Sequence, residues 1–452
     1  MRNIEKRSVM VFLMTLAFFA GLIYHTVNLV MHSSEWVSDP YNAHISDSDG
    51  LEFAGKIYDR NGVILAQTID KKRVYSDDEE LRRACLHVVG DDSTNIATAV
   101  QTVYRSDLTE YNFVFGLGLP ESMKQGKDIK LTIDSEMQRA ALEALGSYKG
   151  AIVFYNYKTG EIVCMVSTPT YDPENIPEDI ETNEEYEGAY LNRVLSSAYT
   201  PGSTFKLITA SAALNELDDA ETRSYYCTGE DEVGGREITC FEPNGEVDIR
   251  EAMAQSCNVF FAQLALDMGK DKMTKYAEKA GFNSTLKIDG IETAESIYDV
   301  SDASDNDLAW SGVGQYTVLE TPINMAVISA AIANGGTPVM PYFMKSIGGS
   351  QKNSTKLGNR IMDKETADKL YEMMDHTVEV NYGKYYFSSK YDVCAKTGTA
   401  EVGDGIAHAW VTGFCKDEDC PLAFSVIVEG GNSGYGVAIP AATKVLDAAP
   451  TF

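Results

Sequence analysis

The segment Pro201-Gly202-Ser203-Thr204-Phe205-Lys206 combines a hydroxyl and an amine at a spacing that permits acyl transfer. It opens an apolar stretch that is expected to be helical, so Ser203 falls in the first turn, where free backbone N–H groups and the helix dipole favour negative charge. Lys206 lies three residues further on and shares a helix face with Ser203. A neutral lysine there can take the serine proton and make Ser203 a nucleophile. A capping serine beside a solvated lysine fits the same pattern.

A second hydroxyl occurs next to an amide in Ser256-Cys257-Asn258. Asp248 and Glu251 resemble the capping pair of a short helix, and an apolar helix is expected from Val259. The triplet is therefore predicted to lie at a junction between two helices, where the serine can relay protons and the asparagine can hold a substrate backbone. A buried polar turn that satisfies the two helix ends is the alternative.

The third candidate is Lys396-Thr397-Gly398-Thr399, inside a β-rich stretch predicted to be a strand over 393–401. A strand offers a row of backbone groups to an extended peptide. Gly398 is expected to let that peptide approach closely, because glycine lacks a side chain. Lys396 and the hydroxyls of Thr397 and Thr399 can bind a carboxylate. An ordinary strand that ends in a turn is the alternative.

Three other triplets match the same short patterns, so order and context decide between them. Lys158-Thr159-Gly160 precedes Ser203 and is expected at a hairpin tip. Ser93-Thr94-Asn95 belongs to the N-terminal region, and Ser304-Asp305-Asn306 is expected in an acidic loop without flanking helices. The assignment of Ser203, Ser256 and Lys396 is therefore favoured.

Residues 147–452 are predicted to form one α+β domain that carries all three motifs. Strands are expected at 151–155 and 161–167, helices dominate from 204 to 334, and strands return at 393–401, 407–414 and 422–429. Thr321-Pro322 is a typical helix start and Asn334-Gly335-Gly336 a typical stop. Strands at both ends with helices between them indicate that the terminal strands share one sheet.

Residues 32–146 are predicted to contain a polar linker, to about residue 50, and a small mixed domain. Asn61-Gly62 stands between apolar runs and is a hairpin signal. A helix is expected from Ser135. Its apolar side carries Met137, Ala140, Ala141, Leu142 and Leu145.

The N-terminus is predicted to be a single membrane anchor at 8–31 behind a short cytoplasmic tail at 1–7. Arg2, Lys6 and Arg7 precede an apolar run that reaches the roughly 20 residues needed to span a bilayer. Basic residues stay on the cytoplasmic side, which places the rest of the chain outside the cell or in the periplasm. A cleaved signal peptide is the alternative, but residues 31–36 make a poor cleavage site.

Composition excludes some partners and leaves the cysteines open. The chain has 452 residues and a net charge of −29, so nucleic acid is not an expected partner. Cys227 and Cys240 bracket a glycine-rich acidic stretch, where a disulfide and two separate thiols fit equally well; Cys415 and Cys420 are a weaker candidate pair. The sequence contains neither H-E-x-x-H nor C-x-x-C, so it predicts no metal site and no cofactor.

Taken together, the three motifs resemble those of penicillin-binding proteins and class A β-lactamases. The chain is similar to class B, monofunctional penicillin-binding proteins from the anchor almost to its last residue. The text around each motif agrees with that family, as do Asn192-Arg193, Asp59-Arg60-Asn61-Gly62, Leu131-Thr132-Ile133-Asp134 and His408-Ala409-Trp410 with Gly413-Phe414. Two departures are a short membrane-proximal region and Ala54-Gly55 in place of the usual Arg-Gly. The resemblance implies an antiparallel sheet with helices on both sides and an N-terminal pedestal.

The resemblance also implies a role for each residue. Ser203 would attack the D-Ala-D-Ala carbonyl of a peptidoglycan stem peptide, with Lys206 as base. Ser256 would relay the proton to the leaving amine, and Asn258 would hold the substrate amide. Lys396, Thr397 and Thr399 would hold the terminal carboxylate of the substrate, on the strand that contains Gly398. The backbone N–H groups of Ser203 and Thr399 would form an oxyanion hole. Penicillin would acylate the same serine.

Other activities on this fold stay open at this point. A D,D-carboxypeptidase would use water as acceptor, and a β-lactamase would need a deacylating glutamate, for which Glu292 and Glu295 lack the E-x-x-L-N setting. A β-lactam-binding scaffold or sensor would keep the pocket without turnover. A glycosyltransferase domain has no room before residue 150. The family implies stem peptides and β-lactams as ligands, and a membrane-embedded wall polymerase of the elongation or division machinery as partner.

Overall fold

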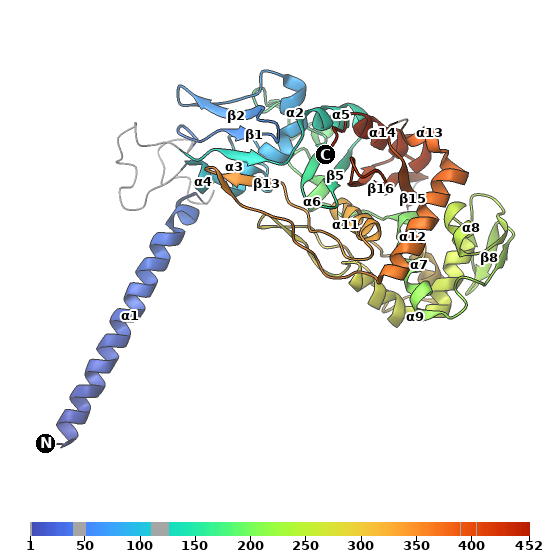
Figure 1. The fold of residues 1–452 in the computed structure, drawn as a ribbon, viewed down its shortest axis with the longest axis horizontal. Helices are drawn as coiled ribbons and strands as arrows, with labels where there is room; N and C mark the ends of the chain where they lie inside the picture. Colours follow the sequence, from blue (N-terminus) through green and yellow to red (C-terminus); the bar gives the residue numbers. More distant parts are fainter. Residues whose placement is uncertain (1, 39–50, 110–125, 389, 404) are drawn as a thin grey trace.

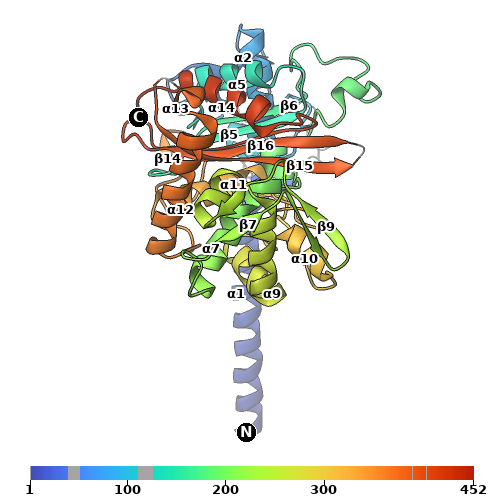
Figure 2. The same ribbon diagram turned by 90° about the vertical axis from the view of Figure 1, so that its right-hand side faces the viewer.

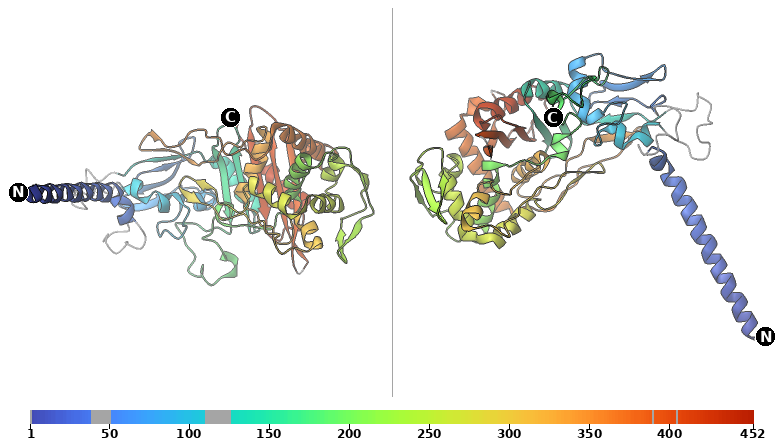
Figure 3. Two further views of the ribbon diagram at one scale, coloured as in Figure 1. Left: turned by 90° about the horizontal axis from the view of Figure 1, so that it is seen from below. Right: turned by 180° about the vertical axis from the view of Figure 1, so that it is seen from behind.

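The computed structural model of the protein describes residues 2–38, 51–109, 126–388, 390–403 and 405–452. A long N-terminal helix, a small sheet domain and a larger α+β body follow one another along the long axis of the molecule (Figures 1 and 3). The N-terminal helix lies at the opposite end from the tip of the body.

Helix α1 (Arg2–Ser38) is the predicted anchor segment. Its stretch Lys6–Asn28 is, within the described ranges, the one helix long and apolar enough to cross a membrane, and the protein covers none of it. The helix continues beyond the predicted end at residue 31, because residues 32–38 contain neither proline nor glycine to stop it. The linker expected up to residue 50 lies, from residue 39, outside the described residues.

A six-stranded sheet forms the core of the small domain, which we call the pedestal. Its strand order is β14-β13-β4-β1-β2-β3. The turn Asn61-Gly62 joins β1 and β2 as predicted, and Gly62 has a φ of 90°. The strands are β1 (Ile57–Tyr58), β2 (Ile64–Ile69), β3 (Lys72–Tyr75), β4 (Ile129–Leu131), β13 (Met344–Ile347) and β14 (Ser350–Gln351), and the helices are α2 (Glu79–Val89), α3 (Val100–Val103) and α4 (Arg105–Thr109). The helix that follows β4, α5 (Ser135–Leu145), packs on the body.

The pedestal sheet takes two strands from a distant part of the chain. β13 pairs antiparallel with β4, and the carboxylate of Asp289 accepts the backbone N–H groups of Phe343 and Met344 at 2.7 and 2.9 Å. This sheet therefore crosses the sequence boundary expected between residues 146 and 147. β13 and β14 are too short to give a periodic sequence pattern. Their place in this sheet depends on contacts with distant residues, which a local pattern does not predict.

The body is built on a five-stranded antiparallel sheet with the order β15-β16-β17-β5-β6. The first and last strands of the predicted domain share this sheet, since β17 pairs with β5. Lys396 on β15 lies opposite Thr412 on β16. The strands are β5 (Gly150–Asn156), β6 (Ile162–Thr168), β15 (Val393–Gly403), β16 (Ile406–Cys415) and β17 (Leu422–Val428).

Helices cover both faces of this sheet, as expected for the fold (Figure 2). Along β5, Ile152 and Phe154 belong to a core shared with α5 and α14 (Ile439–Asp447). Val153 and Tyr155 point the other way, into a core shared with α11 (Pro322–Ala333). The alternation follows from the two-residue period of a strand. All of β5 is buried, because both of its faces are covered.

The remaining elements form a helical region beside the sheet. The predicted start of α11 at Thr321-Pro322 is confirmed, because Thr321 caps the helix. Short hairpins interrupt the region that was expected to be mostly helical. The further helices are α6 (Arg193–Ser196), α7 (Lys206–Glu216), α8 (Ile249–Ala254), α9 (Asn258–Lys279), α10 (Asp305–Ser311), α12 (Lys364–Thr377) and α13 (Lys384–Phe387), and the strands are β7 (Tyr225–Cys227), β8 (Glu230–Val233), β9 (Arg236–Thr239), β10 (Gly245–Val247), β11 (Lys287–Ile288) and β12 (Ile291–Glu292).

Candidate active site

Ser203 lies in a single 3₁₀ turn, Gly202–Phe205, that leads directly into α7. The serine is half-buried, whereas Lys206 is completely buried. Gly202 has a φ of 55°, and a Cβ atom there would lie only 2.6 Å from the carbonyl oxygen of Thr399. Glycine is therefore needed because the turn is pressed against β15. The predicted position of Ser203 in the first helical turn is confirmed.

Strand β15 touches the serine turn through Gly398. A Cβ atom on Gly398 would lie 2.5 Å from the carbonyl oxygen of Pro201. The close approach that glycine permits is thus made by the chain's own turn, whereas the sequence interpretation reserved it for a substrate. On either side of Gly398, Thr397 is half-buried and Thr399 is exposed.

Ser256 occupies the bend between α8 and α9, the predicted junction between two helices. Its φ of 54° lies in the left-handed region, which a serine rarely adopts, and such strain is concentrated at functional sites. The Nζ atom of Lys206 lies 3.1 Å from Ser256 Oγ, and Nζ of Lys396 lies 2.9 Å from the same oxygen. One hydroxyl therefore joins three segments that are far apart in the sequence.

The two lysine amines have further acceptors nearby. Lys206 Nζ donates to Asn258 Oδ1 at 2.7 Å and to the carbonyl oxygen of Ser256 at 2.6 Å. Lys396 Nζ donates to the carbonyl oxygen of Thr397 at 2.9 Å. In the described part of the chain, neither amine forms a salt bridge with a carboxylate. The positive charge of each protonated amine must therefore be stabilised by neutral oxygen atoms.

Burial without a carboxylate partner changes the protonation of both lysines. Desolvation lowers the pKa of Lys206 to about 7, although nearby cysteines raise it in part. Desolvation also holds the pKa of Lys396 well below its ordinary value, and repulsion from Lys206 lowers it further. A lysine with a pKa near neutrality exists partly as a free amine at physiological pH, and a free amine can accept a proton.

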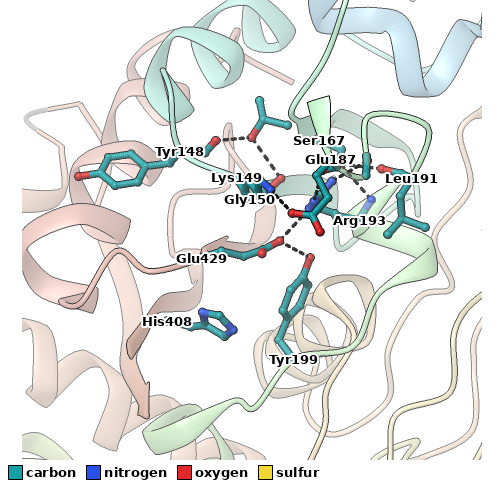
Figure 4. A network of polar contacts seen from close by, with 12 residues as sticks. Tyr148, Lys149, Gly150, Ser167, Glu187, Leu191, Arg193, Tyr199, His408 and Glu429 are labelled. Atoms are coloured by element: carbon teal, nitrogen blue, oxygen red, sulfur yellow. Dashed lines mark hydrogen bonds and ion pairs between the residues drawn. The ribbon is translucent and has the colours of Figure 1, made fainter. Parts of the chain in front are cut away.

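An internal polar network anchors the segment that precedes Ser203 (Figure 4). Glu429 Oε1 accepts from Arg193 Nε at 2.8 Å and from the hydroxyl of Tyr199 at 2.9 Å. Tyr199 also packs edge-to-face against His408, with 5.6 Å between ring centroids. One residue on, the carbonyl oxygen of Thr200 accepts from Nε1 of Trp410 at 3.0 Å. The network ties the serine turn to the sheet.

Comparison with known proteins places these features in a family. Residues 150–447 match the family described as "Penicillin binding protein transpeptidase domain". The chain belongs to the penicillin-binding protein transpeptidases. Among its relatives is the "Peptidoglycan D,D-transpeptidase PbpA" of Mycobacterium tuberculosis, which is 32% identical over 365 residues, covering 72% of this chain and 73% of that protein. "Stage V sporulation protein D" of Bacillus subtilis is 32% identical over 302 residues, or 62% of this chain and 46% of that protein.

Solved structures agree with this membership. Penicillin-binding protein A from Mycobacterium tuberculosis, in a ceftriaxone acyl-enzyme complex, superposes with a TM-score of 0.79 at 28% identity, covering 89% of this chain and 99% of that one. The D,D-transpeptidase domain of a peptidoglycan glycosyltransferase from Eggerthella lenta gives a TM-score of 0.74 at 28% identity, covering 87% and 97%. The resemblance drawn from the sequence motifs is thereby confirmed.

The competing triplets of this penicillin-binding protein lie in other settings. Lys158 is exposed at the tip of the β5–β6 turn, where its Nζ donates to Asn334 Oδ1 at 3.0 Å. Ser304 caps α10 through a reciprocal bond with Asp307, so the expectation that no helix flanks it was wrong. The acidic residues that follow it are the helix's own first turn, where they complement the helix dipole.

Sequence reasoning missed two groups that border the motifs. The hydroxyl of Tyr382 accepts the backbone N–H of Thr397 at 2.9 Å and lies 2.7 Å from Thr397 Oγ1. Nothing in the local sequence distinguishes this tyrosine, because its partner is brought by the fold. The second group consists of Cys227, Cys240 and Cys257, whose sulfur atoms lie within 4.8 Å of one another beside Asn258. All eight cysteines are free thiols, so the expected alternatives for Cys227 and Cys240 resolve to separate thiols.

Proposed function

We propose that this penicillin-binding protein uses Ser203 as the nucleophile of a peptidoglycan D,D-transpeptidase. The enzyme class follows from the family and from relatives named for that activity. The observation that carries the assignment of residues is the position of Ser256 Oγ within 3.1 Å of two buried lysine amines, beside the turn that bears Ser203. A hydroxyl shared by two amines is a path along which protons can move.

Lys206 is proposed as the base that activates Ser203. In its neutral form an amine has two N–H donors and one lone pair. The carbonyl oxygen of Ser256 and Oδ1 of Asn258 can take the two donors, since neither atom can donate a proton. The lone pair is then left for a hydroxyl proton. The lowered pKa of Lys206 makes this neutral form available near pH 7.

The reaction has two steps, and in the first, acylation, one proton moves and an ester bond replaces the donor's peptide bond. Ser203 Oγ forms an ester bond to the carbonyl carbon of the penultimate D-Ala while its proton passes to Lys206. The peptide C–N bond breaks, and the terminal D-Ala leaves as an amine after receiving that proton through Ser256. An amine of a second stem peptide then attacks the ester, forms the crosslinking amide, and returns the proton to Ser203. Asn258 holds the donor peptide's backbone during both steps.

Charge stabilisation is proposed to come from β15 and the serine turn. The backbone N–H groups of Ser203 and Thr399 bind the oxyanion that develops on the attacked carbonyl. The hydroxyls of Thr397 and Thr399 bind the terminal carboxylate of the donor. That carboxylate favours the charged form of buried Lys396, which then supplies positive charge behind them. Gly398 keeps the strand flush against the serine turn, so that donors from both elements face one substrate.

The enzyme is further proposed to be a single-pass membrane protein with its catalytic domain outside the cytoplasm. The apolar stretch Lys6–Asn28 supports the anchor, and the basic residues before it support a cytoplasmic N-terminus. Peptidoglycan lies on the outer side of that membrane. The anchor and the pedestal are proposed to contact a membrane-embedded wall polymerase of the elongation or division machinery. Protease added to intact protoplasts should remove the catalytic domain, and full protection would contradict this orientation.

The activity is tested with the full chain in detergent, a stem peptide ending in D-Ala-D-Ala and a stem peptide with a free acceptor amine. We expect a crosslinked product and one released D-Ala for each crosslink, both measured by mass spectrometry. Ser203→Ala should give neither, whereas Ser211→Ala, a change on the same helix α7, should give both. Release of D-Ala without crosslinks, even at high acceptor concentration, would indicate a carboxypeptidase. Rapid, repeated hydrolysis of penicillin would indicate a β-lactamase.

A further inference from the structure

Three cysteines from three different segments meet directly behind Ser256 and Asn258. Cys227 ends strand β7, Cys240 follows strand β9, and Cys257 caps the N-terminus of α9. The Sγ atoms of Cys227 and Cys240 are 3.6 Å apart, and those of Cys240 and Cys257 are 3.8 Å apart. Cys227 and Cys257 are buried, whereas Cys240 is partly exposed and leaves a route from the solvent.

These separations match a metal–thiolate cluster. A disulfide bond brings two sulfur atoms to about 2.05 Å, far closer than either pair here. A tetrahedral zinc ion holds thiolate sulfur atoms at about 2.3 Å, which places any two of them about 3.8 Å from each other. The Cys227–Cys240 and Cys240–Cys257 distances both lie within about 0.2 Å of that value. If two of the three thiols formed a disulfide, the third would be left without a partner.

Backbone N–H groups are directed at every sulfur atom of the cluster. Cys227 Sγ accepts from the N–H of Gly229 at 3.4 Å, and Cys257 Sγ accepts from the N–H of Phe260 at 3.5 Å. Cys240 Sγ accepts from the N–H of Asn258 at 3.2 Å and from the next N–H along the helix at 3.5 Å. Such donors favour an anionic sulfur, as does the N-terminus of α9, which begins at Asn258 and is kinked at Gly269. The surroundings are therefore arranged for thiolates.

We propose that Cys227, Cys240 and Cys257 bind one zinc ion, with a water molecule or Oδ1 of Asn244 in the fourth position. Asn244 Oδ1 already lies 3.5 Å from Cys227 Sγ. Three thiolates and no oxygen-rich cage select a thiophilic divalent cation over Mg²⁺ or Ca²⁺. Binding releases the protons of those thiols that are still protonated. No metal site was predicted from the sequence, because the three cysteines fit no short metal motif.

The zinc ion stabilises the hairpin segment next to α9 and positions Asn258. Residues 225–247 form two small hairpins, β7–β10 and β8–β9, whose buried apolar side chains are few and include Val233, Ile238 and Val247. A metal that joins both hairpins to α9 supplies the stability that so small a unit lacks. The same ion fixes Asn258 from behind, because the backbone N–H of Asn258 donates to a ligand sulfur and its side-chain Nδ2 donates to the carbonyl oxygen of Thr239 at 2.7 Å. The zinc ion thus positions Asn258, whose Oδ1 contacts Lys206.

The test measures metal content and does not rest on the proposed catalytic roles. The full chain is purified in detergent under reducing conditions without chelator, and its zinc is measured by inductively coupled plasma mass spectrometry. We expect about one zinc ion per chain, and less than about one-tenth of that in Cys240→Ser and Cys257→Ser. Cys164→Ser and Cys394→Ser remove buried thiols outside the cluster and should retain the zinc. After the zinc is replaced by Co²⁺, the wild type should show a thiolate-to-cobalt charge-transfer absorption that both cluster variants lack.

Chelation of the wild type avoids the question of whether a variant folds. Removal of zinc should slow penicillin acylation about tenfold and readdition should restore it; an unchanged rate would refute the positioning of Asn258 while leaving the metal site intact. The metal site itself is overturned if zinc is absent and cannot be loaded, or if Cys240→Ser binds as much as the wild type. A disulfide between any two of the three cysteines in protein taken from native membranes would overturn it too.

Discussion

Replacing Lys206 with Met removes a buried amine while keeping the apolar part of the side chain, and it should nearly abolish acylation. Without Nζ, nothing at this position can take the proton of Ser203, and the contact with Asn258 Oδ1 is lost. Removal of a positioned base costs on the order of 10²- to 10⁴-fold in rate. The rate of penicillin acylation, measured by stopped flow, should fall by that factor.

The pH profile separates a base from a residue that only packs. As the proposed base, Lys206 would react in its neutral form, and burial lowers its pKa to about 7. The acylation rate of the wild type should therefore rise as pH increases through about 7 and then level off. The residual rate of Lys206→Met should not change over that window. An exposed lysine such as Lys158 offers the control, since Lys158→Met should keep both the rate and the profile.

The burial of Lys206 should also make the stability of the fold depend on pH. Lowering the pKa from 10.5 to about 7 corresponds to a folding cost of about 5 kcal/mol for the charged lysine. Between these two values the unfolded state binds more protons than the folded state, so stability increases with pH, and the cost is complete only below about pH 7. From pH 6 to pH 9 the wild type should gain about 3 kcal/mol relative to Lys206→Met in denaturant unfolding.

Two results would contradict the role of Lys206 as the base. A wild-type acylation rate that stays flat between pH 6 and pH 9 would mean that no group with the lowered pKa acts in the step. An acylation rate of Lys206→Met within about threefold of the wild type would mean that the amine is not the base.

Four further outcomes are expected. Lys396→Ala should acylate far more slowly than the wild type, whereas Lys158→Ala should not; the reverse order in stopped-flow rates would exchange the two assignments. Glu429→Gln should lower stability by about 2 kcal/mol in urea unfolding, because it leaves the buried guanidinium of Arg193 without its ion pair. Glu429→Gln should also slow acylation by loosening the turn before Ser203, and an unchanged rate would show that Glu429 does not support that turn. Burial lowers the pKa of His87 to about 4, so stability should fall as pH drops from about 6.5 towards 4 and His87→Leu should flatten that loss; equal unfolding midpoints at pH 7 and pH 5 in the wild type would contradict it.

Much of the body could be predicted because its signals are local. The hairpin around Lys158-Thr159-Gly160, the capped start of α11 at Thr321 and the serine turn before α7 each follow from a short stretch of sequence. The three motifs were found the same way, as patterns of neighbouring residues. Their mutual contact through Ser256 Oγ was expected only from the family resemblance, since no pattern encodes a distance between segments.

The features that escaped prediction are those made by distant partners. β13 joins the pedestal sheet only because the fold brings residues 344–347 beside β4. Gly398 is needed by the turn at Pro201, which is remote in sequence. Tyr382 reaches Thr397 from a different element, and the three cysteines gather from two hairpins and a helix. Each depends on tertiary packing, which leaves no period and no spacing in the sequence.

Mapping the adduct formed with penicillin shows directly whether Ser203 carries the acyl group. We expect the intact mass to rise by one penicillin, the adduct to lie on the peptide containing Ser203, and Ser203→Ala to form no adduct. The adduct should persist, because an acyl-enzyme whose leaving amine stays tethered is shielded from the acceptor. An adduct on another serine, such as Ser304 or Ser211, or acylation of Ser203→Ala at the wild-type rate, would contradict the account.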